Sequence, residues 1–130
     1  MRKRDDRRQG LAAVEFALLL PVLALMIMLL VEGANAMHTY SALVEASREG
    51  ARHVLMQGDA ADVEALVDAL VADLNAQDLS TKVVTDPVAN TITVEVSYDY
   101  RPFGSDNGAT ILGGEDESFQ IVAQTTMPMP

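Results

Sequence analysis

The 130-residue chain has a formal net charge of −10 and contains no cysteine. Five of its nine basic residues lie within the first eight positions, whereas residues 37–130 hold four basic and fifteen acidic side chains. This length allows one small domain, the acidic C-terminal part argues against nucleic-acid binding, and the lack of cysteine excludes disulfides, thiolate metal sites and a thiol nucleophile.

An apolar segment, residues 11–31, follows the basic start of the chain, and Glu15 is its only charged residue. As a helix this segment would be about 31 Å long, which matches the hydrocarbon thickness of a bilayer. We therefore expect a transmembrane helix. A bend is expected at Pro21, because proline lacks the amide that would bond to the carbonyl of Ala17.

The charges that flank the apolar segment predict its orientation. Basic residues precede it and acidic Glu32 follows it, which predicts a cytoplasmic N-terminus and places the rest of the chain across the membrane. The residues that set this orientation are Arg2, Lys3, Arg4, Arg7 and Arg8. A secretory signal peptide is the alternative, since Ala34-Asn35-Ala36 is a small-x-small site that allows a cut before Met37.

Glu15 needs an explanation, because a carboxylate inside a spanning helix costs about 2–3 kcal/mol. Leu11 and Glu15 are four residues apart and so lie on the same helical face, one turn from each other. A cut between Gly10 and Leu11 would create an α-amino cation that Glu15 of the same or a neighbouring chain can neutralise. The spacing then has a physical reason.

A short basic leader that ends in Gly10, followed by Leu11, Glu15 and Phe16 at the start of an apolar helix, resembles the processing site of type IV prepilins. More narrowly, residues 10–56 resemble the TadE-like family, pseudopilins of the tight-adherence (Flp pilus) assembly machinery. The matching features include Pro21 and the stretch Ala46-Ser47-Arg48-Glu49-Gly50-Ala51-Arg52.

The resemblance implies a role and a set of partners. A prepilin peptidase, which is an intramembrane aspartyl enzyme, would cut after Gly10 and leave Leu11 as the mature N-terminus. Glu15 and Phe16 would pair with the freed amine or with another subunit, although major pilins of this machinery usually have tyrosine in place of Phe16. The other implied partners are membrane lipid, further pilins or pseudopilins, and the assembly platform of the bacterial inner membrane.

The helix is expected to continue beyond the membrane segment and to bury one face against a small domain. Apolar and small residues recur there at three- and four-residue spacing: Met37, Tyr40, Leu43, Val44, Ser47, Ala51, Val54 and Leu55. Gly50 lies within this pattern and indicates either a close packing contact, which we favour, or a bend. Gly58 is expected to end the helix.

A second helix is predicted from Asp59, as its N-cap, to Leu79. Its apolar stripe contains Val63, Leu66, Val67, Leu70, Val71 and Leu74. The opposite face is acidic and is interpreted as a solvated surface, with a docking patch as the alternative; it holds Glu64, Asp68, Asp73 and Asp78.

Three strands should follow the second helix. Residues 82–85 are β-branched, residues 86–90 have turn chemistry, residues 91–100 alternate strictly, and residues 119–127 alternate again. The prediction is an α+β fold in which a three-stranded antiparallel sheet lies on the two helices. The domain division that follows is a leader at 1–10, a transmembrane helix at 11–31 and an extracytoplasmic domain at 32–130.

Catalytic candidates are missing. His38 and His53 are about 22 Å apart along one helix and cannot share a metal ion or a proton. The loop from Arg101 to Glu117 has acidic and polar side chains that suit turns better than a calcium site. We expect neither an enzyme nor a bound cofactor.

The sequence leaves three possible roles open. The chain is either a processed, membrane-anchored pilin-like subunit, or an uncleaved anchored binding module for the same machinery that docks through its acidic second helix. The third possibility is a secreted soluble domain released after Ala36.

Overall fold

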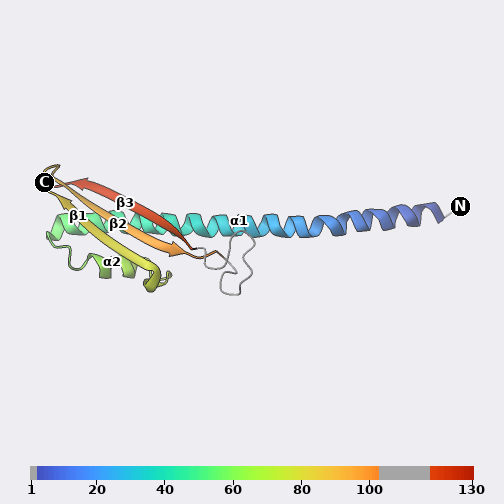
Figure 1. Ribbon diagram of the computed structural model, residues 1–130, viewed down its shortest axis with the longest axis horizontal. Helices are drawn as coiled ribbons and strands as arrows, with labels where there is room; N and C mark the ends of the chain where they lie inside the picture. The colour runs from blue at the N-terminus through green and yellow to red at the C-terminus, as the bar shows by residue number, and fades with distance from the viewer. Residues whose placement is uncertain (1–2, 103–117) are drawn as a thin grey trace. The chain divides into compact units, whose positions relative to one another are not determined.

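The computed structural model describes the backbone of residues 3–102 and 118–130, and the side chains from residue 10 onward within those ranges. The elements are α1 (Lys3–Gln57), α2 (Val63–Leu70), the short 3-10 helix η1 (Ala76–Asp78), and the strands β1 (Leu79–Asp86), β2 (Thr91–Tyr100) and β3 (Phe119–Pro128) (Figure 1). The chain divides into two units, Met1–Asn35 and Ala36–Pro130. The predicted α+β class and its element order are confirmed.

The three strands of the second unit form an antiparallel sheet in the order β1-β2-β3. A tight turn joins β1 to β2, as predicted: the Asp86 carboxylate accepts hydrogen bonds from the backbone N–H groups of Val88 (2.9 Å) and Ala89 (3.0 Å). Asn90 closes this turn with φ of 55°, a conformation that asparagine tolerates better than most residues. β1 begins at Leu79, earlier than the predicted 82–85.

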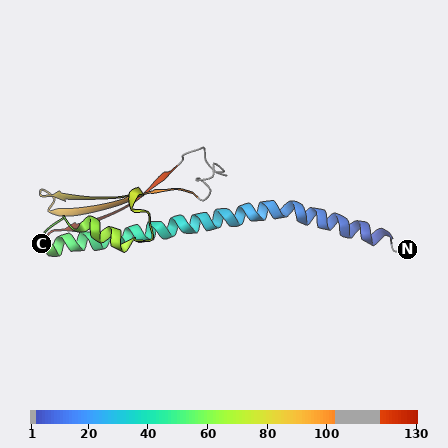
Figure 2. The same cartoon turned by 90° about the horizontal axis from the view of Figure 1, so that it is seen from below.

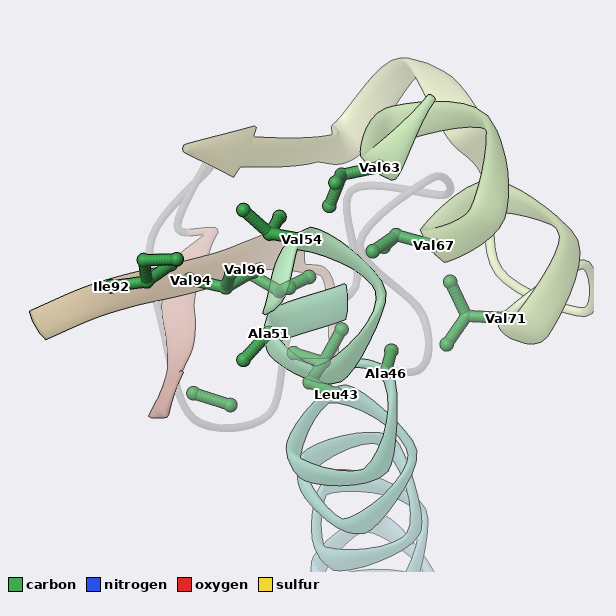
Figure 3. Close-up of a cluster of buried hydrophobic side chains, with 11 residues drawn as sticks. Leu43, Ala46, Ala51, Val54, Val63, Val67, Val71, Ile92, Val94 and Val96 are labelled. Carbon is green, nitrogen blue, oxygen red and sulfur yellow. The ribbon is translucent and has the colours of Figure 1, made fainter. Parts of the chain in front are cut away.

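A continuous apolar core lies between the sheet and the helices of the second unit. In Figure 2 the sheet lies over one side of the C-terminal part of α1. Alternation along β2 gives Ile92, Val94 and Val96 to this inner face, and three valines at four-residue spacing complete it (Figure 3). They are Val63 and Val67 of α2 and Val71 directly after it, and all three are at most 1 % exposed.

Small residues let α1 approach both α2 and the sheet closely. A Cβ atom on Gly50 would lie 3.2 Å from Val63 Cγ1, 3.3 Å from Val94 Cγ1 and 3.7 Å from Val67 Cγ2. Close packing at Gly50 is therefore confirmed. Farther round the helix, the fully buried Ser47 hydroxyl donates to the carbonyl of Val44 (2.9 Å) and lies 2.7 Å from Thr125 Oγ1 on β3. This contact satisfies two polar groups inside the core.

The buried face of α1 differs from the predicted one in part. Leu43, Ser47, Ala51 and Val54 are buried as predicted, and their buried neighbours on the same face are Thr39, Ala46 and Gly50. Met37 and Tyr40 are 66 % and 45 % exposed, so their assignment to the core was wrong. The spacing of apolar residues does not show how much of the apolar side of α1 is covered. The sheet ends at β3 and covers only part of that side.

The end of α1 is as predicted. Gly58 adopts φ of +70°, and its N–H donates to the carbonyl of Val54 at 2.8 Å. This is a left-handed C-terminal cap, which glycine adopts without the steric cost of a side chain.

The second helix is shorter than predicted at both ends. Asp59 accepts a hydrogen bond from the Ala61 N–H (2.9 Å) in a local turn, so it is not the N-cap; that position belongs to Asp62, whose side chain makes no capping hydrogen bond. After Leu70 the chain passes through turns, and the Asn75 side chain accepts from the Gln77 N–H (3.2 Å) to begin η1. Asparagine favours such local side-chain bonds over helix continuation, so the segment before β1 does not extend α2 to Leu79.

Candidate processing site and membrane segment

The first part of α1 exposes apolar side chains on all sides. Between residues 11 and 31, Met28 is partly buried, and the exposed large apolar residues range from 44 % exposed at Leu25 to 71 % at Leu18. Among the described residues, one helix, Gly10–Gln57, is long and apolar enough to cross a membrane, and its most apolar window is 0 % buried. A helix that is apolar all round requires an apolar surrounding. The length and composition of this helix favour membrane anchoring.

The predicted cleavage site lies at the start of this apolar stretch. Gly10 and Leu11 are both exposed within α1, and a Cβ on Gly10 would meet no atom within 4 Å. The peptide bond between them is therefore uncovered by the described part of the chain. The side chains of Arg2, Lys3, Arg4, Arg7 and Arg8, predicted to set the orientation, lie outside the described residues.

Glu15 and Phe16 both lie on the exposed surface of α1, and Phe16 is 60 % exposed. The continuous helix places Leu11 and Glu15 one turn apart on one face, as the sequence indicated. Within the described residues the Glu15 carboxylate forms no hydrogen bond or ion pair. In lipid it would need a cationic or hydrogen-bonding partner from elsewhere.

The described residues contain no cluster of three or more histidine, aspartate or glutamate side chains that could hold a metal ion. His38 and His53 lie on the same helix, α1, fifteen residues apart. The polar and acidic loop considered for calcium is outside the described residues, except for its first two positions. Arg101, at the start of that loop, forms an ion pair with Asp78, with 3.4 Å between Nη2 and Oδ1.

The acidic surface of α2 lies in solvent. Glu64 and Asp68 of α2 are exposed, as is Asp73 in the turns that follow, whereas Asp78 in η1 is half-buried beside Arg101. Sequence reasoning found these acids but missed an exposed row on α1 that contains Met37 and Tyr40. The signal that could have revealed it is the presence of two arginines, Arg48 and Arg52, at helical spacing in the same row.

Comparison with known proteins identifies the N-terminal part of the chain. The family model described as TadE-like protein matches residues 10–52, a range that begins at Gly10 and includes Glu15, Phe16 and the buried face of α1 up to Ala51. No curated protein and no solved structure matches the chain. The sheet and α2 lie outside the matched range. Residues 10–52 therefore form a TadE-like family domain.

Proposed function

We propose that the chain is a membrane-anchored pseudopilin, a minor pilin-like subunit that serves assembly of tight-adherence (Flp) type IV pili. The observation that carries the proposal is the TadE-like match over residues 10–52, which includes an exposed apolar helix beginning at an uncovered Gly10–Leu11 bond. The role is structural, through protein and lipid contacts rather than catalysis. The partners are a prepilin peptidase, other pilins or pseudopilins, and the inner-membrane assembly platform.

The proposed topology has three parts. Residues 1–10 form a cytoplasmic leader held by its arginines and lysine, residues 11–31 span the bacterial inner membrane, and residues 32–130 lie in the periplasm or outside the cell. Excess positive charge before the span supports this direction. The unit boundary between Asn35 and Ala36 falls close to the proposed end of the span.

The first test is the mature N-terminus of the protein made with its native secretion machinery. We expect intact mass and N-terminal peptide analysis to give a chain that begins at Leu11. A chain that begins at Met1 would instead support an uncleaved, anchored binding module, whose acidic α2 surface is exposed and free to dock. A chain that begins at Met37 would show that the apolar run is a signal peptide, and would overturn both anchored roles.

Glu15 is proposed to neutralise the amine that cleavage creates at Leu11 when the helix packs beside another pilin helix. Glu15→Gln keeps the size and removes the charge, so insertion and cleavage should persist. Co-purification with the major pilin should fall about tenfold or more, since removing one partner of a desolvated charge pair costs 2 kcal/mol or more. Glu49→Gln, at an exposed position on the same helix, is the matched control. Unchanged co-purification of the Glu15 variant would contradict this role.

A further inference from the structure

One side of α1 in the second unit carries an exposed row that the sheet leaves uncovered. Its members follow one another at steps of three or four residues, and we call this row the α1 flank: Met37, Tyr40, Val44, Arg48, Arg52 and Leu55. Met37, Tyr40 and both arginines are exposed, whereas Val44 and Leu55 are partly buried and pack against the edge of the core. The row therefore joins an apolar surface to two positive charges.

The α1 flank lies on the side of α1 opposite α2. Gly50 faces Val63 and Val67 of α2, and Ser47 contacts Thr125 on β3. At 100° per residue, Ser47 lies about 60° from Gly50 round the helix axis, and Arg48 lies about 160° from it in the same sense. In Figure 1, α2 and β3 accordingly border α1 on opposite sides. The neighbouring edge strand β3 has no charged side chain.

The opposite side of the second unit carries the complementary charges. The outward residues of α2, which we call the α2 outer face, are Glu64, Ala65, Asp68 and Ala69, and all four are exposed. Because the alanine side chains are small, larger apolar side chains of another surface can approach the α2 outer face closely. Glu64 and Asp68 are four residues apart, as are Arg48 and Arg52, and each pair therefore spans about 6 Å along its helix.

The two charged pairs also lie at the same height along the domain. Arg48 and Arg52 stand two residues on either side of Gly50. Glu64 and Asp68 directly follow Val63 and Val67, the two valines that approach Gly50. A second copy placed beside the first, in the same direction and without sliding along the helix axis, thus brings its two acids level with the two arginines.

Charge makes this match selective. The two arginines are half of the four basic residues in 37–130, against fifteen acidic ones, so most contacts between two copies would be repulsive. Within the described residues neither arginine forms an ion pair. The exposed Glu45 and Glu49 border the flank on one side, so the attraction for an acidic helix of a second copy is confined to the row that contains Arg48 and Arg52.

We propose that copies of this chain associate side by side, with the α1 flank of one copy bound to the α2 outer face of the next. Such an interface uses two different surfaces, so each bound copy presents a free flank to a further copy and a row can grow. Identical chains anchored in one membrane point in the same direction, as the match requires. The proposal does not depend on cleavage after Gly10.

Cysteine cross-linking of the full chain in lipid vesicles tests the contact, because the native chain has no cysteine. Two differently tagged variants, Val44→Cys and Ala69→Cys, are mixed and oxidised. Glu45→Cys replaces Val44→Cys in the matched control, since Glu45 is exposed and lies about 100° from Val44 round the helix axis. We expect the first pair to give about tenfold more mixed dimer than the control pair.

Charge exchange then tests the pairing itself. Arg48→Glu with Arg52→Glu should lower the mixed dimer about tenfold, and so should Glu64→Arg with Asp68→Arg. All four changes in one chain should restore it, whereas Arg48→Lys with Arg52→Lys should leave it intact. Equal yields for the Val44 and Glu45 pairs, failure of the fourfold exchange to restore the dimer, or cross-linking only to another protein would overturn the proposal. The exchanged side chains are all exposed, so the domain core is untouched.

Discussion

Gly50→Leu should strongly destabilise the second unit. A Cβ alone would already lie 3.2 Å from Val63 and 3.3 Å from Val94, and leucine adds three more carbon atoms in a site without space. Overpacking of a tight core typically costs about 1–3 kcal/mol, occasionally more, and the three methyl groups around Gly50 come from two elements, α2 and β2. We expect a loss of 3 kcal/mol or more, seen as a fall of roughly 12 °C or more in the thermal unfolding midpoint.

The matched control is Gly33→Leu. Gly33 lies in the same helix, and a Cβ there would meet no atom within 4 Å. Leucine has the higher helix propensity, so the control variant should unfold at an unchanged or slightly higher temperature. Equal midpoints for the two variants, measured on the full chain by circular dichroism in the same detergent, would show that the approach of α1 to α2 and β2 is not tight.

The double change Leu20→Arg with Leu23→Arg should remove the chain from the membrane. Each arginine near the centre of a span adds about 2.5–3.5 kcal/mol to the cost of insertion, so the pair adds roughly 5–7 kcal/mol. Among the described residues, Leu20 is 50 % and Leu23 is 46 % exposed, so neither is a core residue. The loss should therefore reflect transfer into lipid rather than misfolding. We expect the protein to shift from the carbonate-resistant membrane fraction to the soluble or degraded fraction.

Isoleucine at both positions keeps the hydropathy and should leave the distribution unchanged. Met37→Arg, in the second unit, adds the same charge outside the proposed span and should also leave it unchanged. Retention of the double arginine variant in carbonate-washed membranes would contradict a transmembrane role for residues 11–31.

Local signals in the sequence were enough to predict several elements. Gly58 marks the end of α1 because its left-handed conformation is cheap only for glycine. The strict alternation of residues 91–100 predicts β2 to the residue, although the face opposite the core is half-buried for most of its length and Ser97 on it is buried. Gly50 was expected at a close contact because glycine inside a long helix costs stability unless packing requires it.

The predictions from the sequence differ from the structure at two kinds of position. At one kind, contacts with distant elements determine whether a side chain is buried, and at the other, local side-chain hydrogen bonds determine where a helix begins. Met37 and Tyr40 fit the apolar spacing of α1, but the width of the sheet determines whether that spacing is covered. Asp59 is a favourable N-cap by type, yet its carboxylate binds the Ala61 amide in a turn outside the helix. The predicted processing residues are found exposed on α1, but exposure alone does not identify a peptidase substrate, so the cleavage stays a proposal.

The hydrogen bond between Ser47 and Thr125 joins residues 78 positions apart. Contacts of such long sequence separation form slowly, because a large loop must close before they contribute. The later half of α1 thus has its final neighbours only when β3, the last strand in chain order, has arrived. Until then, the small side chains of Ala46, Gly50 and Ala51 give their part of the helix face less apolar area than larger side chains would. That composition limits premature aggregation while the sheet is still incomplete.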